Sequence, residues 1–224
     1  MLEIKICGIK DLAAMDAALS AGADMVGLVF FPPSPRAVSA EEGARLAARA
    51  RGKALVVALV VDANDALLGA IRKHAAPDIL QLHGGETPAR VSEIRKRFGL
   101  PVMKALPVAD AADLDAVPAY AAVAERILFD ARPPNDATRP GGHGRVFDWS
   151  LLSRVVRSKP IMLSGGLDPD NVATAIRLVR PDAIDVSSGV EKSPGVKDPE
   201  RISRFIANAR AADAQLAPAV ERMS

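Results

Sequence analysis

Residues 183–187 read Ala-Ile-Asp-Val-Ser, and their alternation of apolar and polar side chains decides the fold. Successive residues of a β-strand face opposite sides, so Ile184 and Val186 share one face while Asp185 and Ser187 share the other. The same alternation recurs in the apolar runs at 3–7, 79–83 and 126–130. A sheet covered by helices on both sides would be apolar on both faces. A polar second face instead favours the interior of a closed barrel.

Eight apolar, β-branched runs recur along the chain, near residues 3–7, 25–31, 55–61, 79–83, 102–106, 126–130, 161–164 and 183–187. Segments with helical spacing and good helix formers separate them, and Ser39 and Thr87 stand where such helices should begin. Alternating strands and helices predict a parallel sheet, because a parallel return needs a long crossover. We therefore expect an α/β fold: a single (β/α)₈ TIM barrel with short loops over residues 1–208. A C-terminal helix end and tail should follow over residues 209–224.

Composition excludes several classes of protein. The 224 residues are 49% hydrophobic and 25% charged with a net charge of +2, which is ordinary for a globular chain. A single cysteine, Cys7, excludes an internal disulfide and a cysteine-based zinc site. No apolar run approaches the roughly 18–20 residues that cross a bilayer. We expect a cytoplasmic protein that binds neither membrane nor nucleic acid, since its basic residues are scattered among acidic ones.

Reactive side chains gather where the predicted strands end. An open sheet would bind its ligand at one switch point, whereas a closed barrel collects all eight strand ends around one mouth. These residues are Cys7, Asp62, His83, Asp130, Ser164 and Ser187, with Arg36 in the loop after the second strand. Their distribution over many strands favours the barrel.

Two glycine-containing loops predict a phosphorylated ligand. Ser164-Gly165-Gly166-Leu167 follows the seventh predicted strand, and Ser187-Ser188-Gly189 follows the eighth. Glycine lets backbone N–H groups approach an anion closely, and barrels commonly hold a phosphate at these two loops. The chain has no Walker-type or G-x-G-x-x-G motif, so nothing indicates a nucleotide.

Cys7 and Asp130 are the candidates for acid–base chemistry. Lys5 lies two residues before Cys7 on the same strand face, and a nearby ammonium lowers the pKa of a thiol. Asp130 would be the complementary acid across the barrel, unless it forms an ion pair with Arg126 or Arg132. A Cys7–His83 dyad for hydrolysis also remains open. No His-x-His or Glu-x-x-His arrangement is present, so we expect no metal.

An ordered set of motifs over residues 3–205 resembles the phosphoribosylanthranilate isomerase family. The motifs are Lys5-Ile6-Cys7-Gly8, Gly27-Leu28-Val29-Phe30 with Ser34-Pro35-Arg36, Gln81-Leu82-His83-Gly84, Phe129-Asp130, Gly141-Gly142 with Phe147-Asp148-Trp149, Leu163-Ser164-Gly165-Gly166-Leu167 with Asn171-Val172, and Asp185-Val186-Ser187-Ser188-Gly189-Val190-Glu191. The resemblance implies a (β/α)₈ barrel of tryptophan biosynthesis. Such an enzyme converts N-(5-phosphoribosyl)anthranilate into 1-(2-carboxyphenylamino)-1-deoxyribulose 5-phosphate, an Amadori rearrangement without a cofactor.

The resemblance also implies roles for individual residues. Asp130 would be the general acid that opens the furanose ring, and Cys7 the general base that removes the C2′ proton. Arg36 would face the anthranilate carboxylate, and His83 and Asp185 would orient the substrate. The phosphate-binding residues would be Gly165, Gly166, Ser188 and Gly189. An acid that begins protonated and a base that begins deprotonated predict a bell-shaped pH dependence.

The sequence departs from the family pattern at two positions, and three alternative functions remain open. His143 stands where the family's glycine-rich loop usually has Thr, and Asp62 ends a strand where the family often has Asn. The alternatives are an aminoaldose isomerase of the histidine pathway, a non-catalytic phosphate-ligand sensor, and a cysteine hydrolase that uses His83. The sequence is compatible with a monomer or a homodimer.

Overall fold

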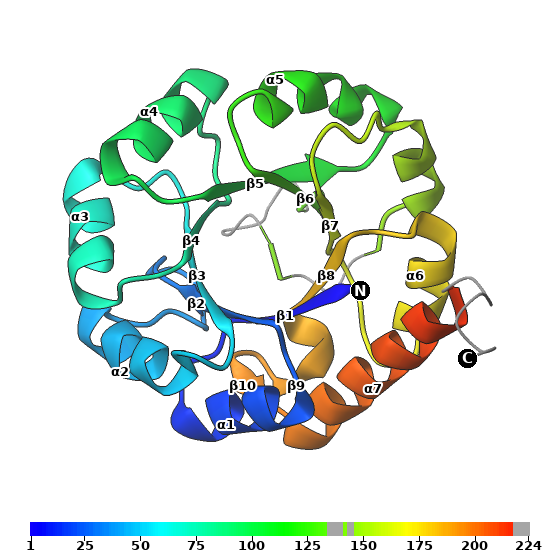
Figure 1. Ribbon diagram of the computed structural model, residues 1–224, viewed down its shortest axis with the longest axis horizontal. Helices are drawn as coiled ribbons and strands as arrows, with labels where there is room; N and C mark the ends of the chain where they lie inside the picture. Colours follow the sequence, from blue (N-terminus) through cyan, green and yellow to red (C-terminus); the bar gives the residue numbers. More distant parts are fainter. Residues whose placement is uncertain (134–140, 143–145, 217–224) are drawn as a thin grey trace, which may run out of the picture.

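Eight parallel strands form a closed barrel, and helices surround it (Figure 1). The structure, a computed structural model, describes residues 1–133, 141–142 and 146–216. Each strand pairs with the next in sequence, and the last pairs with the first, which confirms the predicted barrel. The strands are β1 (Glu3–Cys7), β2 (Met25–Val29), β3 (Leu55–Val60), β4 (Ile79–Leu82), β5 (Val102–Val108), β6 (Arg126–Ala131), β7 (Ile161–Leu163) and β8 (Ala183–Val186).

The helices begin close to their predicted positions. Ser39 caps its helix by accepting a hydrogen bond from the backbone N–H of Glu42, whose carboxylate accepts one from Ser39 in return. Thr87 caps the helix that opens with Pro88. The helices are α1 (Leu12–Ala21), α2 (Ala40–Ala50), α3 (Asp65–His74), α4 (Pro88–Phe98), α5 (Val117–Ala121), α6 (Val172–Val179) and α7 (Pro199–Leu216).

The strict repeat of one strand and one helix breaks down in the second half. A 3-10 helix, η1 (Ala111–Ala116), precedes the short α5. Among the described residues between β6 and β7, the one helical element is a 3-10 helix, η2 (Trp149–Arg154). After β8 come a third 3-10 helix, η3 (Ser188–Val190), and a hairpin of β9 (Glu191–Ser193) and β10 (Val196–Lys197). The final helix α7 packs on the barrel beyond residue 208, since Ala209 and Ala212 are buried. Residues 217–224 of the expected tail and His143 lie outside the described residues.

Two apolar regions stabilise the barrel from opposite sides of its wall. The larger one fills the space between strands and helices, and it includes Ile4, Ile6, Ile184 and Val186. A second cluster fills the inside of the barrel, and its members are Met25, Val57, Ile79, Met103, Ala105, Leu128, Met162 and Ala183. Alternate residues of the strands therefore face the helices and the barrel axis, as the sequence pattern predicts.

A repeated carboxylate holds the amino-terminal ends of the strands in register. In four places, an acidic residue just before an even-numbered strand accepts a hydrogen bond from a backbone N–H near the start of the preceding odd-numbered strand, at 2.7–2.9 Å. The four acidic residues are Asp24, Asp78, Glu125 and Asp182. They stabilise one end of the barrel and leave the other end to carry the site.

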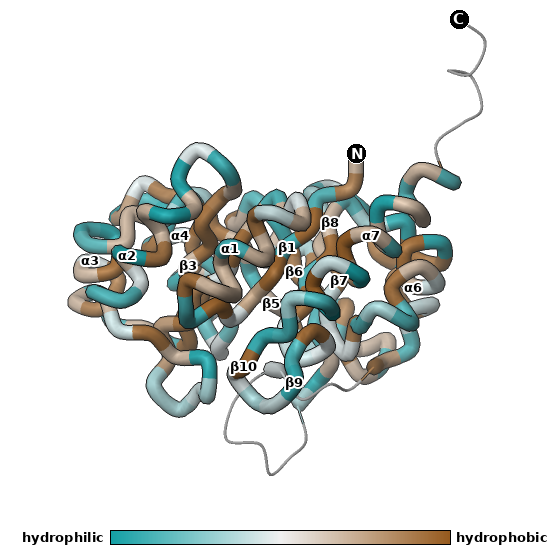
Figure 2. Tube along the Cα trace, turned by 90° about the horizontal axis from the view of Figure 1, so that it is seen from below, coloured by the Kyte–Doolittle hydropathy of each residue, from teal (hydrophilic) through white to brown (hydrophobic). Residues whose placement is uncertain are grey.

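The two ends of the barrel differ in what they carry. Figure 2 shows the N-terminus and the end of α7 on one side, and the β9–β10 hairpin on the opposite side. Because all eight strands are parallel, the hairpin lies at their carboxyl ends, where barrel enzymes place their active sites. In the described part of the chain, no helix is long and apolar enough to cross a membrane.

The inside of the barrel should be sensitive to loss of volume. Leu128 is fully buried within the interior cluster, so Leu128→Ala should lower the free energy of unfolding by about 2–5 kcal/mol through lost burial and the cavity left behind. Leu178→Ala is the matched control, because that side chain is 56% exposed and its loss should cost less than about 0.5 kcal/mol. Urea unfolding of both variants would measure this, and equal losses would contradict the placement of Leu128.

Candidate active site

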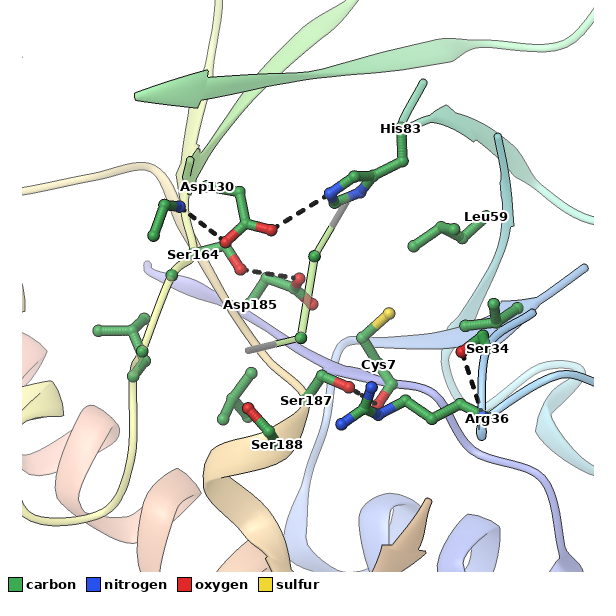
Figure 3. Close-up of a pocket in the computed structure, with 18 of the residues that line it drawn as sticks. Cys7, Ser34, Arg36, Leu59, His83, Asp130, Ser164, Asp185, Ser187 and Ser188 are labelled. Carbon is green, nitrogen blue, oxygen red and sulfur yellow. Dashed lines mark hydrogen bonds and ion pairs between the residues drawn. The ribbon is translucent and has the colours of Figure 1, made fainter. Parts of the chain in front are cut away.

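A pocket opens at the carboxyl ends of the strands and encloses about 760 Å³, part of it continuous with solvent. It is lined by residues from widely separated parts of the sequence, which the barrel brings together (Figure 3). The predicted site residues that line it are Cys7, Arg36, His83, Asp130, Gly165, Gly166, Asp185 and Ser188. Gly189 is the one predicted site residue that does not line the pocket.

Gly189 instead allows the loops after β7 and β8 to approach each other. A Cβ atom at position 189 would lie 1.9 Å from the backbone oxygen of Leu167, far inside van der Waals contact. The loop after β7 is held from its other side by Asn171, whose side-chain amide donates to the backbone oxygen of Gly166 at 2.8 Å. Only a residue without a side chain fits at position 189, which explains the glycine that the sequence motif singles out.

Cys7 ends β1 inside the barrel, beside a buried ion pair. Lys5, two residues earlier on the same face, is fully buried and donates to Asp185 across the β1–β8 seam at 2.9 Å. A second oxygen of Asp185 accepts a hydrogen bond from the Ser164 hydroxyl at 3.2 Å. The Cys7 and Lys5 side chains both lie over Gly27, where a Cβ would come within 2.8 Å of Sγ and 3.0 Å of Nζ. Cys7 therefore has the neighbouring ammonium that the strand parity predicts.

The predicted lowering of the Cys7 pKa is wrong, because the surroundings of the thiol raise its pKa. Burial, together with the negative charge of Asp185, raises the pKa of the thiol, and the attraction of Lys5 and Lys197 only offsets part of that rise. Burial alone would lower the pKa of Lys5, but the charges of Asp185 and of the Cys7 thiolate outweigh it and raise that pKa. Spacing along a strand reveals the ammonium but not the desolvation that opposes it.

Asp130 faces His83 across the pocket, and neither arginine proposed as its partner reaches it. The Nε2 atom of His83 lies 3.2 Å from Oδ2 of Asp130, and the backbone N–H of Ala131 donates to Oδ1 at 2.9 Å. Arg126 pairs with Glu3, and Arg132 pairs with Asp113, instead. The ion-pair alternative for Asp130 is therefore wrong.

The Cys7–His83 dyad is not formed among the described residues either. The ring of His83 is bonded on one side to Asp130 and on the other to Gln81, whose Nε2 lies 2.9 Å from Nδ1. Figure 3 shows the imidazole directed at the Asp130 carboxylate, with no bond to the Cys7 sulfur. Without a bond to His83, Cys7 lacks the base that a cysteine hydrolase needs.

Arg36 is held by a buried carboxylate that the sequence analysis did not assign. Its Nε and Nη2 atoms both donate to Glu191 at 2.8 Å, and Glu191 also accepts from Lys197 at 2.8 Å. Burial opposes ionisation of Glu191, but Arg36 and Lys197 outweigh it and lower the pKa of this carboxyl. One side of the Arg36 guanidinium is thus already occupied, and Arg36 presents its remaining donors at the pocket.

The sequence motifs include Gln81 and Glu191 without giving them a role, and Lys197 lies outside the motifs. Gln81 was detectable, because it shares the inward face of its strand with His83. Glu191 and Lys197 belong to the β9–β10 hairpin, which carries no signal of strand alternation and comes after the expected end of the eighth strand. In the described part of the chain, no group of three or more His, Cys, Asp or Glu side chains could hold a metal ion.

Comparisons with known proteins agree with this geometry. Residues 4–208 match the family model described as N-(5'phosphoribosyl)anthranilate (PRA) isomerase. The chain belongs to this family. Over 212 residues it is 61% identical to the N-(5'-phosphoribosyl)anthranilate isomerase of Rhodopseudomonas palustris (strain BisA53), which covers 95% of the chain and 97% of that relative. The membership confirms the isomerase activity in tryptophan biosynthesis that the motifs predict.

Solved structures of the isomerase family share the barrel. The phosphoribosyl anthranilate isomerase of Thermotoga maritima superposes with a TM-score of 0.85 at 37% identity, covering 94% of this chain and all of that one. A second structure of the isomerase, at a TM-score of 0.81, 34% identity and the same coverage, holds reduced 1-(o-carboxyphenylamino)-1-deoxyribulose 5-phosphate. A third, equal to the second in score, identity and coverage, contains monomers generated from the dimeric T. maritima isomerase.

The raised pKa of Cys7 should be visible in its reactivity. Cys7 is the only cysteine of this isomerase, so mass spectrometry reports its alkylation by iodoacetamide directly. The rate should rise with pH to a midpoint above the ordinary cysteine value of about 8.5, because burial disfavours the thiolate. In urea-unfolded protein, the midpoint for the same thiol should return to about 8.5. A folded midpoint below the unfolded one would contradict the raised pKa.

Proposed function

We propose that Cys7 and Asp130 carry out the isomerisation as general base and general acid. One observation carries the proposal: the thiol on β1 and the carboxyl group on β6 line the same pocket from different sides of the barrel. Two titratable groups that face one ligand can give and take a proton in the same turnover. The pocket therefore suits a reaction that moves hydrogen within one molecule.

The first step is ring opening by the acid. Asp130 gives its proton to the furanose ring oxygen, the bond between that oxygen and C1′ breaks, and a Schiff base forms between C1′ and the anthranilate nitrogen. His83 holds the Asp130 carboxyl group in place through the 3.2 Å contact at Oδ2. Asp130 ends this step as a carboxylate.

The second step is removal of the C2′ proton by the base. The Cys7 thiolate takes this proton, the C2′–H electron pair forms the enolamine, and the enolamine tautomerises to the ketone. Because burial raises the pKa of Cys7, its thiolate is scarce at neutral pH but is a stronger base once it forms. Exchange with water then returns the proton balance of Cys7 and Asp130 to its starting point.

Two ends of the pocket suit the two anionic groups of the substrate. The phosphate would lie against Gly165, Gly166 and Ser188, with Gly189 keeping their two loops together. The anthranilate carboxylate would meet the donors of Arg36 that Glu191 leaves unused. Asp185, which lines the pocket beside Cys7, would orient the sugar together with His83.

The apolar part of the pocket suits the aromatic ring of anthranilate. Val29, Phe31, Leu59 and Val61 form a small cluster with Cys7, and all four line the pocket. An aromatic ring placed there would bury its faces against aliphatic side chains while its carboxylate reached Arg36. The substrate would then lie with its aromatic ring at the apolar cluster, its sugar in the middle of the pocket and its phosphate at the loops after β7 and β8.

The proposed site is complete within one chain, so both a monomer and a homodimer could carry it. All its groups come from the strands, loops and hairpin of the same barrel. We infer a cytoplasmic location, because a lone catalytic thiol needs a reducing compartment to remain unmodified.

Removing either proton-transfer group should abolish most of the activity. Cys7→Ala and Asp130→Asn should each lower kcat by about 10²–10⁴-fold, the usual contribution of a general acid or base. The assay is the loss of fluorescence as phosphoribosylanthranilate is consumed. Asp16→Asn, at a half-exposed surface ion pair, is the control and should keep full activity. A Cys7→Ala or Asp130→Asn enzyme as active as the wild type would refute the assignment.

A negative charge at the expected phosphate position should weaken binding. Ser188→Asp places a carboxylate where the phosphate would lie, and like-charge repulsion of several kcal/mol should raise KM by more than about tenfold. Inorganic phosphate should protect the wild type against heat, and it should protect Ser188→Asp much less. Ser203→Asp, exposed on α7, adds the same charge away from the pocket and should change neither. An unaltered KM in Ser188→Asp would place the phosphate elsewhere.

A further inference from the structure

Gln81 has a buried side-chain amide, of which one polar atom has a hydrogen-bond partner among the described residues and the other has none. It lies on β4, fully enclosed in the barrel, two residues before His83. Its Nε2 atom lies 2.9 Å from Nδ1 of His83, whereas its Oε1 atom is buried without a hydrogen-bond partner among the described residues. Buried polar atoms are nearly always paired, so an unpaired one in a site calls for an explanation.

The contact with Gln81 decides which nitrogen of His83 carries the hydrogen. If the amide N–H donates to Nδ1, that nitrogen must be bare, and the hydrogen lies on Nε2, directed at the Asp130 carboxylate. If the amide is turned by 180°, its oxygen accepts from Nδ1–H, and Nε2 is left with a lone pair. A bare Nε2 can only accept, so it fits an Asp130 that carries a proton.

Among residues 1–133, 141–142 and 146–216, no hydrogen bond on the far side of the amide fixes it in one orientation. The unpaired Oε1 shows that the outer half of the amide has no partner among the described residues to lose when it turns. Lys104 is a buried lysine on the neighbouring strand β5. Its ammonium group already donates to the backbone oxygens of Leu82 and Gly84 and to the Glu86 carboxylate. The amide oxygen and nitrogen are similar in size, so the turn needs no new space.

We propose that Gln81 is a positioning residue whose amide turns to match the proton on Asp130. In the ionised state, Gln81 donates to Nδ1, and Nε2–H donates to the Asp130 carboxylate. In the protonated state, Gln81 accepts from Nδ1–H, and Asp130 donates to Nε2. The two states differ by one proton, which the pocket exchanges with water. This inference rests on the proposed function in one respect, the role of Asp130 as the acid.

Other titratable and charged groups lie around this chain of hydrogen bonds, and all of them except Cys7 form ion pairs of their own. They are Lys5 and Cys7 on β1, Arg36 after β2, Glu86 after β4, Lys104 on β5 and Asp185 on β8. Among the described residues, the one hydrogen bond of the Gln81 side chain goes to His83, so the amide responds to the ring rather than to these charges.

The hydrogen on His83 can be followed directly by ¹⁵N NMR of histidine-labelled protein. The chain has three histidines, and a His83→Gln sample identifies the signals of His83. In the wild type, we expect Nε2–H at alkaline pH and Nδ1–H with a bare Nε2 after the Asp130 proton is added. Gln81→Glu, which only accepts, should keep Nδ1–H throughout, and Asp130→Asn should abolish the exchange. A ring with hydrogen on both nitrogens when the pair is protonated, or one unchanged with pH, would overturn the proposal.

Kinetics separate positioning from mere packing. Gln81→Met should lower kcat by about tenfold, the order of effect of an outer hydrogen-bond partner, with KM nearly unchanged and the pH profile displaced. Ile79→Val, two residues earlier on the same inward face, alters packing without touching His83 and should keep the wild-type profile. A Gln81→Met enzyme with the wild-type profile and tautomer would refute the role of Gln81 while Asp130→Asn remained inactive. A fully active Asp130→Asn would instead refute the proposed function.

Discussion

The ion pair of Lys5 and Asp185 sits at the seam where the first and last strands close the barrel. The two residues are direct partners in the β1–β8 register, and their charged groups meet 2.9 Å apart inside the barrel. Neither charge could remain there alone, because an unpaired buried ion carries an uncompensated desolvation cost of several kcal/mol. Closure of the barrel and ionisation of the pair therefore depend on each other. The serine at the end of β7, Ser164, completes the arrangement by donating to Asp185.

This seam sets the electrostatic surroundings of Cys7. Cys7 follows Lys5 by two residues on the same face of β1. There is space for both side chains because Gly27 on the neighbouring strand has no Cβ. Burial raises the pKa of Cys7, the Lys5 charge opposes that rise, and the negative charge of Asp185 adds to it. The thiol is therefore mostly protonated near neutral pH, and its thiolate is a strong base when it forms. A strong base of this kind fits the abstraction of a proton from carbon that we propose for Cys7.

The alternation of residues along a strand predicts which side chains point into the barrel. It predicts little about the contacts that form between distant segments when the barrel closes. Strand parity placed Lys5, Cys7, His83, Asp130 and Asp185 inside the barrel, because the direction of a side chain follows from its position in the strand. The pairing of Asp130 with His83, and of Arg36 with Glu191, joins segments 47 and 155 residues apart. No local pattern encodes such distances. The pKa of Cys7 was mispredicted for the same reason, since desolvation depends on everything that surrounds the thiol.

The cluster around Arg36 shows why an unpredicted hairpin belongs to the site. A free arginine side chain would lose conformational entropy when it bound a carboxylate, whereas this one is held by two bonds to Glu191 before any ligand arrives. Glu191 can stay ionised in its buried position because Lys197 shares it, and the same lysine donates to the backbone oxygen of Ser187 at the end of β8. The Arg36 guanidinium lines the pocket, so the hairpin holds a cationic group in place at this wall through Glu191.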